Sequence, residues 1–151
     1  MSLTTVTHLN FRGRAAEALG FYQSVFGGEL QVTRYAQLGM PAEAPDADKV
    51  VFGRLFADNG FRVLAYDVPG SGPAPVEPTT RREQGLTLTS EPFFLSVQGQ
   101  SLEEVRGYWD GLADGATVVE ELAPSAWSPG FGMLTDRFGV TWVLDVAPVV
   151  G

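Results

Sequence analysis

The first 68 residues carry a pattern of apolar and polar positions that predicts one strand, one helix and three further strands. Residues 5–11 alternate in polarity, with His8 and Asn10 on the same face, as expected for a strand. Over residues 15–26 the apolar positions recur at helical spacing, and the glycine pair at 27–28 ends that helix because glycine tolerates a left-handed backbone. The remaining strands are predicted over 30–35, 50–56 and 61–67, with a loop over 37–48 and a hairpin turn at 58–60.

A second copy of the same order follows a stretch rich in proline and glycine. Residues 69–92 form this stretch, which we interpret as a linker with a short strand over 86–89. Residues 101–104, Ser-Leu-Glu-Glu, fit a capping box that opens a helix reaching about residue 112. Strands are predicted around this helix over 93–97, 117–122, 131–135 and 140–146. The chain therefore divides into a first module, residues 1–68, the linker, and a second module, residues 93–151, within one compact domain.

Together the two halves predict an α+β fold made of two β-α-β-β-β modules. Each module buries one sheet face under its helix, so the other faces can form a concave, mostly antiparallel sheet with the helices on its convex side. The concave face is a cup in which a small molecule could bind. In the last strand, Trp142, Leu144 and Val146 alternate to the helix side and are assigned to the core.

Composition narrows the chemistry that such a domain can perform. The chain has 18 acidic and 10 basic residues and a net charge of -8, so binding to nucleic acid or to an anionic membrane is not expected. Cysteine is absent, and His8 is the only histidine, which excludes thiolate sites and multi-histidine metal sites within one chain. Neither a membrane-spanning apolar stretch nor a signal-peptide pattern is found, so a cytoplasmic protein is predicted.

Several short segments resemble a known family. They are His8-Leu9-Asn10-Phe11, Glu17-Ala18-Leu19-Gly20-Phe21-Tyr22, Phe26-Gly27-Gly28-Glu29, Trp127-Ser128-Pro129-Gly130-Phe131-Gly132-Met133 and Asp136-Arg137-Phe138-Gly139-Val140-Thr141-Trp142. Over about residues 5–146 the chain resembles the PhnB-like branch of the vicinal oxygen chelate superfamily, which contains glyoxalase I, extradiol dioxygenases, and bleomycin and fosfomycin resistance proteins. The resemblance implies a homodimer with a small-molecule site. Members of this branch are often labelled methyltransferases, but the sequence has no glycine-rich loop typical of S-adenosylmethionine binding.

The resemblance also implies where a metal would be bound. Metal-using relatives place four ligands on the first and last strand of each half, where a divalent ion stabilises an oxyanion intermediate. Carried over by position, His8 fits the first of these, while Phe94, Leu64 and Val143 fall on the other three. An imidazole with three apolar companions cannot hold a divalent metal against water. We therefore expect no cofactor and no catalytic metal.

The candidate binding residues are those predicted to face the cup: His8, Asn10, Arg54, Tyr66 and Trp127. His8 is interpreted either as a hydrogen-bonded residue at a strand end or as a residue that contacts ligand. Arg54 and Arg62 alternate onto the face shared with His8, where they could bind an anionic ligand or lie at a sheet edge with their stems over apolar surface. Trp127 could stack on a flat ligand or pack at a dimer seam.

Two functions remain open from the sequence. One is a small-molecule binding protein of the glyoxalase/bleomycin-resistance type that would sequester an aromatic or cationic toxin, with the net charge of -8 favouring cations. The alternative is a lyase, isomerase or dioxygenase-type enzyme of the same superfamily. In that enzyme His8, the one candidate catalytic residue, would act as the base, and Arg54 or Tyr66 would stabilise an oxyanion. Neither interpretation identifies the ligand or the pathway.

Overall fold

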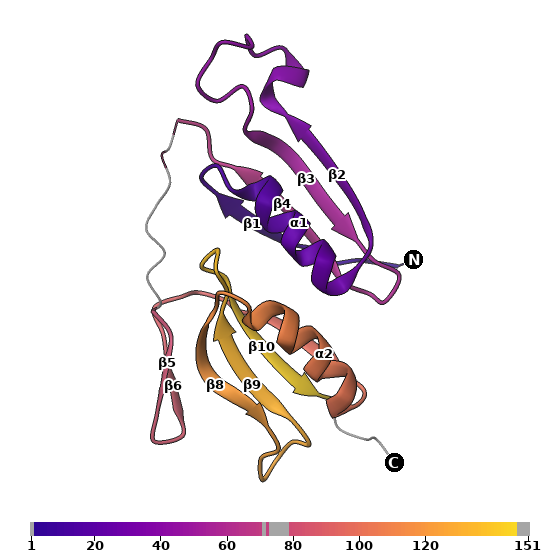
Figure 1. Cartoon of the computed structure of the whole chain (residues 1–151), viewed down its shortest axis with the longest axis vertical. Coiled ribbons are helices and arrows are strands. Elements are labelled where there is room, and N and C mark those ends of the chain that lie inside the picture. The colour runs from indigo at the N-terminus through magenta and orange to yellow at the C-terminus, as the bar shows by residue number, and fades with distance from the viewer. Residues whose placement is uncertain (1, 71, 73–78, 148–151) are drawn as a thin grey trace. The chain divides into compact units, whose positions relative to one another are not determined.

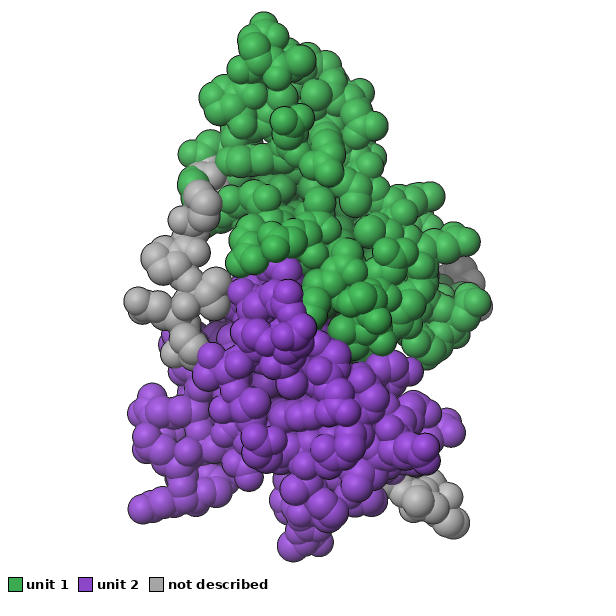
Figure 2. Space-filling model, in the orientation of Figure 1, with its two compact units in different colours: residues 1–75 green, residues 76–151 purple. Residues whose placement is uncertain are grey.

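The computed structural model describes residues 2–70, 72 and 79–147, which divide into two compact units, residues 1–75 and 76–151 (Figures 1 and 2). Unit 1 contains β1 (Thr7–Phe11), α1 (Ala15–Phe26), β2 (Glu29–Arg34), the short 3-10 helix η1 (Tyr35–Leu38), β3 (Val50–Phe56) and β4 (Arg62–Asp67). Unit 2 contains β5 (Arg81–Glu83), β6 (Leu86–Leu88), β7 (Leu95–Gly99), α2 (Leu102–Ala113), β8 (Thr117–Ala123), β9 (Phe131–Thr135) and β10 (Thr141–Val146). The predicted α+β class is confirmed.

Each unit has a four-stranded sheet of the same topology, with strand orders β1-β4-β3-β2 and β7-β10-β9-β8. The β1–β4 and β7–β10 pairs are parallel and all other pairs are antiparallel, which confirms the predicted mostly antiparallel strands. In each unit the helix joins the first strand to the edge strand on the far side of the sheet, and it packs across one sheet face (Figure 1). Because the two sheets share one topology, equivalent positions can be matched between the units.

Three segments differ from the pattern-based prediction. The loop predicted over 37–48 begins inside η1, which covers residues 35–38. The linker predicted over 69–92 contains the β5–β6 hairpin, in which β6 is the short strand predicted over 86–89 and β5 was not predicted. The turn of that hairpin uses Gln84 and Gly85 at positive φ, 52° and 79°, and Gln-Gly is a weak turn signal in a sequence. The strand predicted over 93–97 lies two residues later, as β7. Phe93 precedes the residues that pair with β10, and its side chain is 55% exposed. Residues 71 and 73–78 of the predicted linker lie outside the described residues.

The core of unit 1 lies between α1 and the inner strands. Leu19 of α1 and Leu55 and Val63 of the sheet are fully buried. Gly53 lets the helix approach β3 closely, since a Cβ there would stand 2.5 Å from Leu19 Cδ1. Because α1 packs on this face of the sheet, the side chains that alternate to the opposite face do not contact the helix.

The core of unit 2 confirms the predicted faces of the last strand. Trp142 and Leu144 are fully buried and Val146 is 4% exposed, on the side of the β10 strand that faces α2. The helix begins as the capping box predicted, with Ser101 Oγ accepting the backbone N–H of Glu104 at 3.2 Å. Among the described residues no helix is long and apolar enough to span a membrane.

Candidate functional site

The sheet face of unit 1 that is turned away from α1 carries four of the five predicted binding residues. Val63 and Ala65 of β4 are buried, so Leu64 and Tyr66 between and beyond them point to the open face. The strand register places them beside the other predicted residues: His8 pairs with Leu64, Asn10 with Tyr66, and Arg54 with Leu64 from the opposite side. The structure thus places His8, Asn10, Arg54 and Tyr66 on one face.

His8 is oriented by two neighbours on this face. Its Nδ1 lies 3.1 Å from Asn10 Oδ1, and its ring centroid lies 5.4 Å from that of Tyr66 at an interplanar angle of 64°. Because a carboxamide oxygen can only accept a hydrogen bond, this contact is a hydrogen bond in the tautomer whose Nδ1 carries the proton. In the neutral imidazole, Nε2 is then unprotonated and can accept a hydrogen bond or a proton from a ligand.

Arg54 and Arg62 both lie over the same aromatic ring. The Cζ atoms of Arg54 and Arg62 are 4.5 Å and 5.3 Å from the centroid of the Phe56 ring. Neither guanidinium group forms an ion pair with a carboxylate within the described ranges 2–70, 72 and 79–147. The arginines that do form ion pairs there are Arg14, Arg81, Arg82 and Arg137. Both groups therefore remain available as donors to a ligand.

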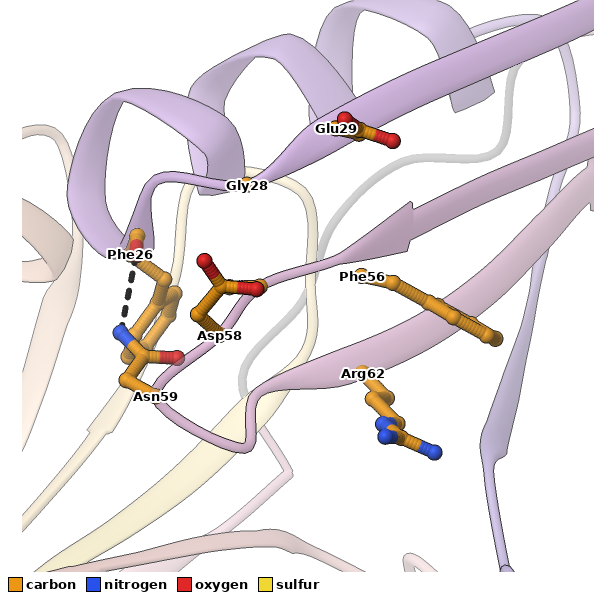
Figure 3. Close-up of a pocket in the computed structure, with 8 residues that line it drawn as sticks. Phe26, Gly28, Glu29, Phe56, Asp58, Asn59 and Arg62 are labelled. Atoms are coloured by element: carbon orange, nitrogen blue, oxygen red, sulfur yellow. Dashed lines mark hydrogen bonds between the residues drawn. The ribbon is translucent and has the colours of Figure 1, made fainter.

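A cavity of about 560 Å³ opens beside Arg62, at the end of the sheet where the β3–β4 turn meets the end of α1 (Figure 3). It is lined by Phe26, Gly28, Glu29, Phe56, Ala57, Asp58, Asn59 and Arg62. Asn59 holds the turn in place, because its Nδ2 donates to the Phe26 carbonyl at 3.0 Å and its Oδ1 accepts from Phe61 N at 3.0 Å. The sequence identified residues 58–60 only as a turn, since the approach of α1 to that turn is a tertiary contact.

Two titratable groups of unit 1 have shifted pKa values. The Tyr35 hydroxyl donates to the Asp67 carbonyl at 2.9 Å, and burial, with smaller effects of Tyr66 and Asp67, raises the pKa of Tyr35. A hydrogen bond from Lys49, and a second from the Gly70 backbone, lower the pKa of Asp46. At neutral pH Tyr35 is therefore protonated and Asp46 is ionised.

The four positions expected for metal ligands do not form a suitable donor set. His8 pairs with Leu64 in unit 1, and the equivalent pair in unit 2 is Ser96 with Val143. The assignment of Phe94 was wrong by two residues, because Phe94 precedes β7 and Ser96 occupies the place of His8. One imidazole, one serine hydroxyl and two aliphatic side chains do not fit a divalent metal. Within the described residues no group of three or more His, Asp or Glu side chains could hold one.

The fifth predicted binding residue, Trp127, belongs to unit 2. It is 64% exposed, and its ring lies 4.8 Å from the ring of Phe131. Phe131 pairs with Asp145, whose Oδ2 accepts from Gln98 Nε2 at 3.4 Å. Asp145 Oδ1 is buried without a hydrogen-bond partner among the residues that the structure describes. Trp127 is thus an exposed aromatic surface next to a polar position of the unit 2 sheet.

Comparisons with known proteins agree with this architecture. The protein from Pseudomonas aeruginosa called PA1353 is 30% identical, with 96% of this chain and 98% of that chain covered and a TM-score of 0.73. A PhnB protein from Bacillus cereus, described as a putative 3-demethylubiquinone-9 3-methyltransferase, shares the fold at 24% identity and a TM-score of 0.72, covering 96% of this chain and 100% of that one. Protein YjdN of Escherichia coli (strain K12) is 29% identical over 140 residues, 92% of each chain.

The family model that matches is described as "Glyoxalase/Bleomycin resistance protein/Dioxygenase superfamily", and the match spans residues 5–144. It includes every helix and sheet of both units except the last residues of β10. The resemblance expected from the sequence motifs is therefore confirmed over nearly the whole chain. The chain belongs to the glyoxalase/bleomycin resistance protein/dioxygenase superfamily.

Proposed function

We propose that the protein binds a small organic molecule on the open face of unit 1, in the cytoplasm and without a metal ion. His8, Asn10, Arg54 and Tyr66 are the side chains that bind it. The observation that carries the proposal is the arrangement of His8, whose Nδ1 lies 3.1 Å from Asn10 Oδ1 and whose ring lies edge-on to the ring of Tyr66. Membership of the superfamily supports the same interpretation, since its named members include resistance proteins.

A thermal-shift screen of metabolites and antibiotics tests this proposal. A ligand present at 100 times its dissociation constant is expected to stabilise the protein by about 2.7 kcal/mol, which raises the melting temperature measurably. His8→Ala and Tyr66→Phe should each weaken the binding of any true ligand. Tyr108→Phe, which removes the hydroxyl of a half-buried tyrosine on α2, is the matched control and should leave binding unchanged. Ligands that are insensitive to both site variants would contradict the proposal.

The absence of a metal from this site is tested separately. Protein purified without chelator is expected to contain far less than one equivalent of zinc, nickel, manganese or iron by elemental analysis, because Leu64, Ser96 and Val143 cannot complete a ligand set with His8. About one equivalent of any of these metals, lost in His8→Ala, would show that the donor set has been assigned wrongly.

A catalytic role is the second candidate, and the contact of His8 with Asn10 favours it specifically. The neutral tautomer that donates from Nδ1 to Asn10 has an unprotonated Nε2, which is suited to act as a general base, and Arg54, one strand away from Leu64, could stabilise an oxyanion. The reaction would then be of the lyase, isomerase or dioxygenase type. A bound ligand from the screen that is converted by the parent protein and not by His8→Ala would establish this role.

We also propose that the protein is a homodimer. The sheets leave exposed edge strands and large exposed aromatics such as Trp127, which association can cover. Light scattering should give twice the chain mass of 16.2 kDa, and Trp127→Ala should weaken either the dimer or ligand binding. A monomer at micromolar concentration, with Trp127→Ala silent in both assays, would contradict this prediction.

A further inference from the structure

The internal duplication allows side chains on the open face of unit 1 to be compared with their equivalents in unit 2. Leu64 and Val143 follow the turn glycines Gly60 and Gly139 at the same distance, and each lies on the last strand of its unit. With this pair as reference, the strand registers match Arg54 with Met133, Phe56 with Thr135, and Arg62 with Thr141. One corner of each sheet can therefore be compared residue by residue.

In unit 2 this corner is covered by a segment of the same unit, residues 80–91. Thr141 Oγ1 lies 3.0 Å from Oε1 and 2.9 Å from Oε2 of Glu91, to which it can donate a hydrogen bond. Thr87 Oγ1, on β6, donates to Met133 Sδ at 3.8 Å. Met133 and Thr141 are 1% and 2% exposed. A carboxylate of the chain itself thus occupies the corner of unit 2 and is held there by neutral hydroxyl groups.

In unit 1 the same corner carries two guanidinium groups in place of Met133 and Thr141. Arg54 is half-buried and Arg62 is exposed, and both contact the Phe56 ring. Neither forms an ion pair with any residue that the structure describes in unit 1 or unit 2. The two arginines lie on the inner strands β3 and β4 and not on an edge strand, and the cavity of Figure 3 opens beside Arg62.

We propose that the ligand of unit 1 presents a carboxylate or another oxyanion group to Arg54 and Arg62, in the position that Glu91 takes in unit 2. This inference rests on the proposed function, because it names the chemical class of the ligand for the same open face. A guanidinium group donates two parallel hydrogen bonds to a carboxylate or phosphate, and these charge-assisted bonds are stronger than neutral ones. The Phe56 ring orders both guanidinium groups before the ligand arrives.

Direct contacts, and not net charge, would hold an anion at this corner. A net charge of -8 favours cations at long range, but at physiological ionic strength charges are screened beyond about 8 Å. Near the corner, Glu29 lies opposite Phe56 on the edge strand β2, and Asp58 lines the cavity beside Arg62. These two carboxylates balance the charges of Arg54 and Arg62, so the attraction for an anion comes from the charge-assisted hydrogen bonds that the two guanidinium groups can donate.

Titration of the protein by two-dimensional NMR tests the inference with benzoate, its neutral isostere benzamide, and inorganic phosphate. Benzoate is expected to bind about tenfold more tightly than benzamide, because only the anion can form the charge-assisted bonds. Arg54→Gln and Arg62→Gln should each weaken benzoate binding about tenfold and leave benzamide binding unchanged. Arg12→Gln, which removes an exposed arginine outside this corner, is the control for total charge.

Each outcome of the titration either supports or overturns the oxyanion class of ligand. Phosphate that shifts the same resonances as benzoate supports the oxyanion class, and phosphate binding without benzoate binding assigns a phosphate-type group. Equal binding of benzoate and benzamide overturns the inference, as does an effect of Arg12→Gln equal to that of Arg62→Gln. The inference is also overturned if neither benzoate nor phosphate binds at about 20 mM, since a dissociation constant of that size corresponds to a binding free energy of only about 2 kcal/mol.

The inference and the proposed function can fail independently. A screened metabolite whose binding is lost in His8→Ala and unchanged in Arg62→Gln would leave the proposed function standing and remove the inference. Benzoate binding that depends on Arg54 and Arg62, with no ligand sensitive to His8→Ala or Tyr66→Phe, would support the oxyanion site and contradict the proposed roles of His8 and Tyr66. Arg62 is exposed, so its variant is expected to fold as the parent does, and the melting temperature checks this.

Discussion

Replacing Trp142 by alanine is expected to destabilise the protein by about 3–5 kcal/mol, since this side chain is fully buried under α2 and its loss leaves a large cavity. The substitution also removes a hydrogen bond, because Trp142 Nε1 donates to Asp136 Oδ2 at 2.9 Å inside the core. Asp136 is 2% exposed, and its other oxygen accepts the backbone N–H groups of Phe138 and Val140. Trp142 therefore contributes both packing and a partner for the carboxylate that shapes the β9–β10 turn.

Urea unfolding followed by far-ultraviolet circular dichroism measures this effect without depending on tryptophan fluorescence. Phe93→Ala is the matched control, since Phe93 is 55% exposed and its removal creates no cavity. Trp142→Phe keeps an aromatic ring but removes the donor, so it should cost about 1–3 kcal/mol and separate the hydrogen bond from the packing. A change below about 1 kcal/mol in Trp142→Ala would show that the faces of β10 are reversed.

Asp67→Ala is expected to destabilise unit 1 by at least about 3 kcal/mol, because it leaves three backbone donors without their acceptor. Asp67 is 1% exposed at the end of β4. Its Oδ1 accepts the N–H groups of Gly13 and Ala15 at 2.8 Å and 3.0 Å, and its Oδ2 accepts that of Val50 at 2.9 Å. The N-cap residue of α1, Arg14, makes no capping bond through its side chain, so Asp67 supplies the acceptor for this end of the helix.

The same urea experiment tests this prediction. Asp58→Ala removes an exposed carboxylate from the β3–β4 turn and is expected to change the free energy of unfolding by less than about 0.5 kcal/mol. Asp67→Asn keeps one acceptor oxygen and should be less damaging than Asp67→Ala. Equal stability of Asp67→Ala and the parent would mean that water replaces the carboxylate at the start of α1, and that the connection between β1, α1 and β3 is weaker than the hydrogen bonds indicate.

The sequence by itself determined most of the helices and strands, and which face of each is buried. The helix over 15–26, the strands over 50–56 and 131–135, and the buried face of β10 with Trp142 all follow from local spacing of apolar residues, because periods of 3.6 and 2 residues distinguish helix from strand. Ser101 could be identified as a cap for the same reason, since a capping box lies within four consecutive residues. Alternation also placed His8, Asn10, Arg54 and Tyr66 on one face, although it could not show which of them touch.

Only the tertiary structure decided the contacts that join distant segments. Asp67 accepts a hydrogen bond from α1 across more than 50 residues of sequence, and Glu91 accepts one from Thr141 across 50 residues. No local sequence pattern can therefore predict either hydrogen bond. The shift from Phe94 to Ser96 has the same origin, because strand register is set by pairing with β10 and not by the strand's own residues. Whether Arg54 and Arg62 are edge residues or inner ones likewise depends on strand order, β1-β4-β3-β2, which is a property of the assembled sheet.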